Sequence, residues 1–169
     1  MRPGYRIRQF WQALTAVPSA EVPPELSPGL RELFLGMSPA DRSHALRTYQ
    51  RLLASGQISR DLAIAALLHD VGKSLAPIHL WDRVCFVLAA RLAPAWLRRL
   101  AAGTGSIRWP GLIALQNHAE QGARWVEAAG GVPQVVALIR YHHSPPDSLP
   151  WSPGERALLA ALQRADEAS

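Results

Sequence analysis

The residues of this sequence that are best suited to chemistry are histidines and aspartates inside or at the ends of apolar, helix-like segments. Residues 66–74 read ALLHDVGKS, where an apolar run meets an adjacent His69 and Asp70 and then a glycine. We expect Gly72 to end the helix, because a glycine just past the last turn is a common stop. A stop signal does not account for two neighbouring metal-binding side chains. His69 and Asp70 are therefore candidate ligands of a reactive site.

Further candidate ligands recur along the chain. They are His44, His118, His142, His143 and Asp166. Neutral imidazole binds transition metals, and a carboxylate can bridge two cations, so one aspartate among several histidines suits a two-metal site. At a metal separation of roughly 3.5–4 Å, a shared water loses a proton near neutral pH and becomes a nucleophile, while the metals neutralise charge on an attacked phosphoryl group. The pattern indicates metal-assisted attack without a separate protein nucleophile.

Lys73 lies three residues after Asp70 and is the one lysine among 18 basic residues, the other 17 being arginine. Lysine supplies a compact point charge on a flexible stem, which the planar guanidinium of arginine does not reproduce. Next to a metal site, such a cation can hold a phosphate oxygen or stabilise developing negative charge. We therefore expect a specific role for Lys73.

Helical periodicity dominates the sequence, with little strand signal and no internal repeat. Ser38 and Ser152 each precede a proline and are followed three residues later by an acid, a pattern typical of a capped helix start. We expect helices near 5–16, 24–35, 39–55, 60–70, 78–93, 95–102, 111–129, 133–143 and 153–167. The sequence thus predicts an all-α fold, a single compact helical bundle.

Five of the expected helices each carry at least one candidate ligand. His44 lies in 39–55, His69 and Asp70 end 60–70, His118 lies in 111–129, His142 and His143 end 133–143, and Asp166 lies in 153–167. Metal sites of helical bundles are built from inward-facing side chains of several helices. We expect the ligands to meet in the core.

Composition restricts the class of protein further. A chain of 169 residues that is 49% hydrophobic and 18% charged is most simply one globular domain. The single cysteine, Cys85, forms no internal disulfide, and neither an export signal nor a transmembrane stretch is evident, so we expect a cytoplasmic protein. The net charge of +5 comes with scattered arginines and no nucleic-acid-binding motif. We therefore expect a small anionic, phosphate-containing substrate and no duplex nucleic acid as partner.

Residues 1–37 are expected to form an N-terminal helical arm that packs on the body, and residues 38–169 to form the metal-binding domain. The segment 5–16 combines arginines with aromatic residues, so a helix lying on a membrane surface is the alternative interpretation of the arm. Residues 77–105 are long and apolar and could shape or cover the pocket.

The order His44, His69-Asp70 and Asp166, together with the stretch ALLHDVGK, resembles the HD superfamily of metal-dependent phosphohydrolases, which is named for its adjacent histidine and aspartate. The resemblance covers residues 38–167, most of the chain. It implies a helical domain of the HD type in which these four residues hold a first metal ion. It also implies that Asp70 bridges to a second metal ion.

His118 and the pair His142-His143 resemble the subset of the superfamily with additional ligands, which includes HD-GYP phosphodiesterases and HD domains that cleave cyclic di-AMP. This resemblance implies that the three histidines and Asp70 hold the second metal ion. It implies catalytic roles for Asp70 and Lys73, with Lys73 facing the substrate phosphate. The implied cofactors are two divalent transition metals, with iron or manganese foremost and zinc, cobalt or nickel as alternatives. The implied activity is that of a phosphodiesterase or phosphatase acting on a nucleotide or cyclic (di)nucleotide through a metal-bridging hydroxide.

The sequence departs from HD-GYP proteins after the paired histidines, where it continues SPPDSLPWSPG and lacks the Gly-Tyr-Pro signature. Cyclic di-GMP is therefore not the expected substrate. His79 matches no position of the motif, and we interpret it as a structural or rim residue; Asp147 lies where HD-GYP proteins continue their motif, and we assign it no role. Two other functions stay open: a mixed-valent di-iron oxygenase of the HD fold, which uses the same ligands, and a non-catalytic HD module that binds a nucleotide and signals to a partner.

Overall fold

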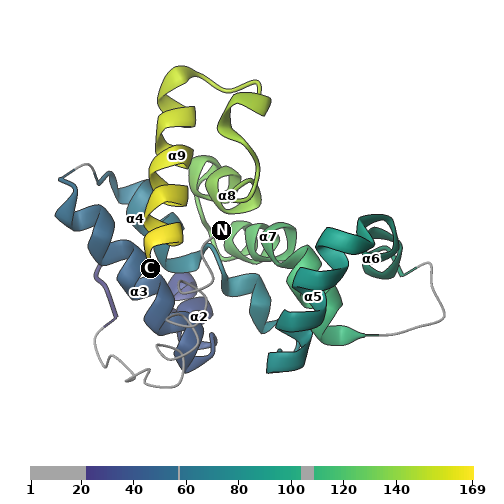
Figure 1. Cartoon of the computed structure of the whole chain (residues 1–169). Helices are drawn as coiled ribbons and strands as arrows, with labels where there is room; N and C mark the ends of the chain where they lie inside the picture. The colour runs from purple at the N-terminus through teal and green to yellow at the C-terminus, as the bar shows by residue number, and fades with distance from the viewer. Residues whose placement is uncertain (1–21, 57, 104–108) are drawn as a thin grey trace.

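The computed structural model describes residues 22–56, 58–103 and 109–169, and within them every regular element is helical (Figure 1). In chain order the elements are α2 (Pro28–Leu35), α3 (Pro39–Ala54), α4 (Arg60–Leu68), the 3₁₀ helix η1 (Val71–Leu75), α5 (Leu80–Leu92), α6 (Pro94–Ala101), α7 (Pro110–Ala128), α8 (Pro133–Arg140), the 3₁₀ helix η2 (Pro146–Ser148) and α9 (Pro153–Ala168). The prediction of an all-α single domain is confirmed. The expected helix at 5–16, and with it most of the expected arm 1–37, lies outside the described residues.

The helix starts follow the capping signals of the sequence. Ser38 Oγ accepts a hydrogen bond from the backbone N–H of Asp41 at the start of α3, and Ser152 Oγ accepts one from Glu155 at the start of α9. Proline occupies the first position of α2, α3, α6, α7, α8 and α9, where its missing N–H removes no hydrogen bond from the helix. Both predicted serine caps are confirmed.

Five of the described helices are shorter than the sequence predicts: α3 by one residue, α5 by three, and α2, α4 and α8 at the ends described next. α2 begins at Pro28 rather than at 24, because the preceding serine takes the extended conformation of an N-cap. α4 ends at Leu68 rather than at 70, since Asp70 has left helical geometry with φ −100° and ψ 4°. α8 ends at Arg140 rather than at 143, since Tyr141 has also left helical geometry, with φ −108° and ψ 12°. The two candidate ligand pairs therefore lie in the first turn beyond α4 and beyond α8.

Helix α4 is the centre of the main hydrophobic core. Every residue from Leu62 to Leu68 is buried, and α4 packs against α3, α8 and α9. Leu30 and Phe34 of α2 belong to the same core. A helix that is apolar on every face is stable only where neighbours cover it on all sides. The surrounding helices thus hold the end of α4, and the residues that follow it, in a fixed place.

Gly72 allows η1 to lie directly against α7. A Cβ atom at Gly72 would be 2.0 Å from the carbonyl oxygen of His118 and 2.8 Å from the backbone nitrogen of Gly122. The expectation that Gly72 ends a helix is wrong: α4 ends earlier, at Leu68, and Gly72 is not among the described glycines with positive φ. Glycine is required here because two backbones approach each other more closely than a side chain permits.

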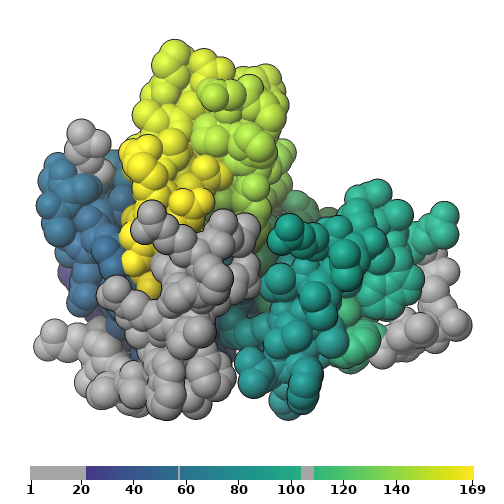
Figure 2. Space-filling view, in the orientation of Figure 1, coloured from purple at the N-terminus to yellow at the C-terminus, as the bar shows by residue number. Residues whose placement is uncertain are grey.

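Helices α5 and α6 form a smaller unit that projects from one side of the bundle (Figures 1 and 2). They pack against each other and against α7. A second hydrophobic cluster joins the three helices; it consists of Leu97, Leu100 and Leu112, with Cys85, Phe86, Ala89, Trp109 and Ile113 packed around them. Among the described helices, none combines the length and apolarity needed to cross a bilayer.

Candidate metal centre

The seven candidate ligands converge where α3, α7 and α9 meet the ends of α4 and α8. Two sets of three have ligand atoms within 4.8 Å of one another: His44, His69 and Asp70, and His118, His142 and His143. Asp166 of α9 contacts two members of the former set. We call His44, His69, Asp70 and Asp166 the first group, and the remaining three histidines the second group.

In the first group, the carboxylate of Asp166 faces two histidines. Its Oδ1 atom lies 2.7 Å from His44 Nε2 and 3.4 Å from His69 Nε2. The end of α9 is tied to α3, because the hydroxyl of Thr48 donates a hydrogen bond to the buried Ser169 Oγ at 3.1 Å. This contact keeps the last turn of α9 folded and Asp166 beside His44.

The second group consists of three imidazole rings whose Nε2 atoms approach one another. His118 Nε2 lies 3.3 Å from His142 Nε2 and 3.1 Å from His143 Nε2. His118 and His142 are buried, whereas His143 is exposed. The group is therefore open to solvent on the side of His143.

Asp70 belongs to the first group but also borders the second. One of its carboxylate oxygens faces the histidines of the first group, and the other faces the second group. Oδ2 is 3.5 Å from His69 Nε2 and 3.8 Å from His44 Nε2, while Oδ1 is 3.5 Å from His118 Nε2. The residue is only 3% exposed, so water does not compete for these oxygens. A carboxylate whose oxygens face different sets of imidazoles is suited to bridging two cations.

The three buried histidines are oriented by their own backbone. In each ring, Nδ1 lies within hydrogen-bond distance of the carbonyl oxygen three residues earlier: His69 with Ala66 at 2.9 Å, His118 with Leu115 at 2.8 Å, and His142 with Ile139 at 2.6 Å. A carbonyl can only accept, so Nδ1 carries the proton and Nε2 is the atom left to bind a metal ion. Sequence spacing gives no sign of this orientation, because it depends on the rotamer of each side chain.

The Nε2 atoms of these histidines are better suited to binding a metal ion than to forming hydrogen bonds with each other. With Nδ1 protonated in both rings, His118 Nε2 and His142 Nε2 turn two lone pairs toward each other at 3.3 Å, and neither can donate to the other. The buried Nε2 of His69 has no hydrogen-bond partner among the described residues, since its contacts with the two carboxylates lack hydrogen-bond geometry. Buried polar atoms without a partner are rare. A cation coordinated by these nitrogens would supply the missing interaction.

Burial keeps two histidines of the second group neutral. It lowers the pKa of His118 to about 4, where Asp70 opposes the shift and Lys73 and His143 assist it. Burial and the neighbouring imidazoles hold the pKa of His142 well below its ordinary value. Both rings are therefore neutral at pH 7, and neutral imidazole is the form that binds a metal ion.

At His69, neighbouring carboxylates raise the pKa of the imidazole rather than lowering it. Burial lowers its pKa, but Asp70 and Asp166 outweigh burial and raise the pKa to about 9. Burial acts to raise the pKa of Asp70, yet Lys73 and the histidines hold it well below its usual range. Burial also acts to raise the pKa of Asp166, but the hydrogen bond with His44 and the nearby imidazole of His69 outweigh burial and hold this pKa well below its usual range. A metal ion at His69 would release the proton from this ring.

Lys73 lies at the edge of the site. Its Nζ donates to Asp70 Oδ2 at 2.5 Å, and the side chain is 16% exposed. The backbone N–H of Lys73 donates to the carbonyl oxygen of Asp70 at 2.9 Å, so the turn of η1 brings the ammonium group back over the aspartate. The cation is thus held beside a candidate ligand and remains open to solvent.

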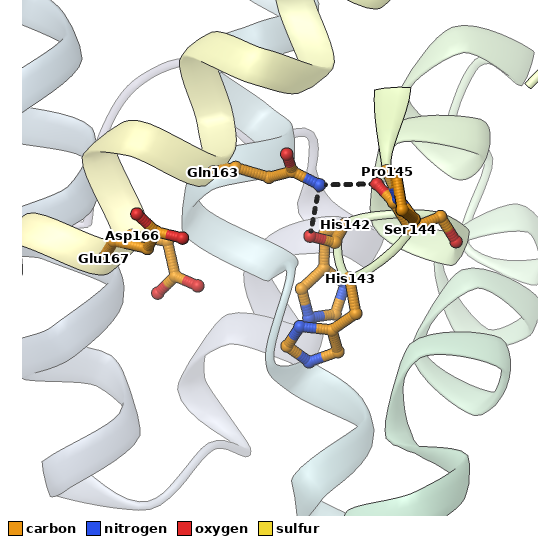
Figure 3. A pocket seen from close by; sticks show the side chains of 7 residues that line it. All are labelled: His142, His143, Ser144, Pro145, Gln163, Asp166 and Glu167. Atoms are coloured by element: carbon orange, nitrogen blue, oxygen red, sulfur yellow. Dashed lines mark hydrogen bonds between the residues drawn. The ribbon is translucent and has the colours of Figure 1, made fainter. Parts of the chain in front are cut away.

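A cavity of about 240 Å³ adjoins the second group and Asp166 (Figure 3). Its lining consists of His142, His143, Ser144, Pro145, Gln163, Asp166 and Glu167. Gln163 was not singled out in the sequence; its Nε2 donates to the carbonyl oxygens of His142 at 3.0 Å and Ser144 at 2.7 Å (Figure 3). It therefore holds the turn that carries the paired histidines. Its only sequence signal is a position one helical turn before Asp166.

His79 and Asp147 belong to neither group. His79 is the N-cap residue of α5, Asp147 lies in η2, and both are exposed. The buried acid of this region is Asp82, which no motif indicated. It accepts hydrogen bonds from the backbone N–H of His79 at 2.6 Å and the indole N–H of Trp109 at 2.5 Å, and a Cβ at Gly111 would collide with it. Asp82 thus fastens the start of α5 to the start of α7.

Comparison of the chain with models of protein families, with curated proteins and with solved structures found no match in any of the three. The fold and the site define an all-α protein with a cluster of histidines and aspartates that could hold metal ions. Its function has to be inferred from these side chains and their geometry.

Proposed function

We propose that the protein is a metal-dependent phosphohydrolase of the HD type, a phosphodiesterase or phosphatase that acts on a nucleotide or cyclic (di)nucleotide. The observation that carries this proposal is the position of Asp70, whose two oxygens face separate sets of histidines. One carboxylate shared between two imidazole sets is a donor arrangement suited to two transition metals. The resemblance of ALLHDVGK to the core motif of the HD superfamily supports the same assignment.

Each group would hold one metal ion, with Asp70 common to both. The first ion would take His44, His69, Asp70 and Asp166, and the second would take Asp70, His118, His142 and His143. When bound, two such ions lower the pKa of a water molecule and neutralise negative charge on a phosphoryl group. Iron and manganese suit mixed imidazole and carboxylate ligands, and zinc, cobalt and nickel are alternatives.

In this proposal Lys73 would contact the substrate phosphate. Its ammonium group lies beside Asp70 and is partly exposed, so it can reach a phosphate oxygen and stabilise the charge that develops there. The adjoining cavity of about 240 Å³ has room for a phosphate group, with the rest of the ester lying outside it. The net charge of +5 favours the approach of an anion.

A turnover assay tests the proposal. Protein loaded with Mn²⁺ or Fe²⁺ is incubated with aryl phosphate monoesters and diesters, with nucleotides and with cyclic dinucleotides. We expect hydrolysis that a chelator abolishes and that Asp70→Ala reduces by at least roughly a thousandfold. Asp147→Asn removes an exposed acid outside both groups and is the matched control, which should keep full activity.

The assay has outcomes that contradict the proposal. A metal-loaded protein that hydrolyses none of these substrates is not the proposed enzyme. Binding of a nucleotide without hydrolysis would instead identify a non-catalytic module. Consumption of oxygen with an organic substrate would identify an oxygenase.

A further inference from the structure

Helix α5 is apolar on the face that meets α7 and also on the face that meets water. Cys85, Phe86 and Ala89 point into the second hydrophobic cluster. Six other apolar residues are exposed, and we call them the outer face of α5: Leu80, Trp81, Val84, Val87, Leu88 and Leu92. A helix that is apolar all round is normally buried on all sides. A contiguous exposed apolar patch of this kind marks an interaction site.

The outer face extends along the whole helix. Trp81, Val84, Leu88 and Leu92 follow one another at steps of three and four residues, which places them on one side of α5. Trp81 and Leu92, at the two ends, are 73% and 77% exposed. Single exposed leucines on the surface are ordinary, but a row of them with a tryptophan is not.

The exposed charge on α5 and α6 has one sign. The exposed charged residues of α5 and α6 are all arginines: Arg83, Arg91, Arg98 and Arg99. The acid of these two helices, Asp82, is buried and hydrogen-bonded to His79 and Trp109. Arg83 also forms an ion pair with Asp41 of α3 at 3.5 Å, so the proposal below relies on Arg91 and Arg98.

We propose that α5 and α6 dock on the surface of an anionic lipid bilayer. Apolar residues of the outer face would enter the boundary between head groups and acyl chains, while the arginines contact lipid phosphates. Trp81 and the exposed Trp96 of α6 fit this arrangement, because tryptophan prefers the membrane interface. α5 has 13 residues and is about 20 Å long. The hydrocarbon core of a bilayer is about 30 Å thick, so α5 would lie in the plane of the interface.

A second copy of the chain is a less suitable partner for the same surface. Two outer faces brought together would also bring their arginines together, and neither α5 nor α6 has an exposed acid to pair with them. Like charges placed opposite each other disfavour association. Anionic lipid instead offers the complementary charge. This inference is independent of the proposed hydrolase activity.

Flotation of the full chain with lipid vesicles tests the proposal. We expect binding to vesicles that contain phosphatidylglycerol, weaker binding to pure phosphatidylcholine vesicles, and a decrease in binding as salt is added. The triple variant Trp81→Ser, Leu88→Ser, Leu92→Ser should bind at least roughly tenfold less. The matched control Leu35→Ser, Leu53→Ser changes two leucines that are each 46% exposed on α2 and α3, and it should bind as the parent does.

A second variant tests the contribution of the arginines to binding separately from that of the apolar residues. Arg91→Gln, Arg98→Gln leaves the apolar residues in place and should weaken binding to the anionic vesicles only. All these positions are exposed, so circular dichroism and the melting temperature should change little. The proposal is overturned if the chain does not bind anionic vesicles, or if the triple and arginine variants bind as the parent does. A dimer that the triple variant dissociates, without vesicle binding, overturns it in favour of a second copy.

Discussion

The backbone of Gly72 lies directly against the carbonyl group of His118, so closely that a Cβ atom at Gly72 would be 2.0 Å from that oxygen. Gly72 follows Asp70 in the turn of η1, and Asp70 Oδ1 lies 3.5 Å from His118 Nε2. The contact between the two backbones therefore sets the distance between the carboxylate and the second group. Gly72 is not a candidate ligand, but its backbone contact sets the spacing between the candidate ligands Asp70 and His118.

Gly72→Ala should destabilise the fold and separate the two groups. The added methyl group would meet the backbone of α7, which cannot rotate away as a side chain can, so we expect a loss of about 2–4 kcal/mol in the free energy of unfolding. Chemical denaturation measures this loss. Gly36→Ala is the matched control, because its Cβ would be at an ordinary 3.5 Å from the nearest atoms. Equal stabilities of the two variants would contradict the proposed role of Gly72.

Substitution of single ligands should remove metal ions in a defined order. The parent chain should bind two equivalents by elemental analysis, and Asp70→Ala should lose both, because Asp70 faces both groups. His118→Gln should lose one equivalent and keep the other. His79→Gln changes an exposed histidine outside both groups and should keep two. Retention of two equivalents by Asp70→Ala would rule out the shared carboxylate.

Substitution of Lys73 should affect turnover without affecting metal content. Its ammonium group contacts Asp70 but supplies no lone pair to a metal ion when protonated. We expect Lys73→Ala to lower kcat/KM by roughly a hundredfold while two equivalents of metal remain bound. Lys73→Arg should restore activity only in part, because the planar guanidinium does not reproduce the compact charge. An unchanged kcat/KM in Lys73→Ala would show that the lysine serves folding alone.

Protein stripped of metal by a chelator should lose stability as the pH falls from about 6.5 to about 4. The pKa of His118 is lowered from 6.5 to about 4 in the folded chain, so within this window the unfolded chain binds the proton more readily. Unfolding is then favoured by up to about 3 kcal/mol from His118. Denaturation at a series of pH values measures the slope. His118→Gln should flatten it, and an equally steep slope in that variant would contradict the assignment.

At alkaline pH, the stability of the metal-free protein should change in the opposite direction, falling as the pH rises. The pKa of His69 is raised from 6.5 to about 9, so its contribution to stability is complete below about 6.5 and is lost as the pH rises through 9. The stripped protein should therefore be most stable near pH 6.5. His69→Gln should remove the alkaline part of the profile and leave the acid part.

Local signals and long-range contacts differed in how well the sequence predicted them. The serine caps at Ser38 and Ser152 act within one turn, so the starts of α3 and α9 could be predicted. The ligands could be named because five of the expected helices each carried at least one, and the structure places all seven in one cluster. The roles of Gly72 and Gln163 could not be predicted, because each depends on a backbone that a distant part of the chain brings beside it.

The hydrogen bond between Asp82 and Trp109 joins two residues that are 27 positions apart, at the starts of α5 and α7. The intervening chain therefore leaves the bundle and returns to it at one fastened point. Between these two ends, Leu97 and Leu100 of α6 also pack against Leu112 of α7, so buried residues of the segment hold it on the bundle. The exposed positions of the α5–α6 unit, such as Trp81 and Leu92, take no part in these buried contacts, so substitutions there should leave the ligand cluster unchanged.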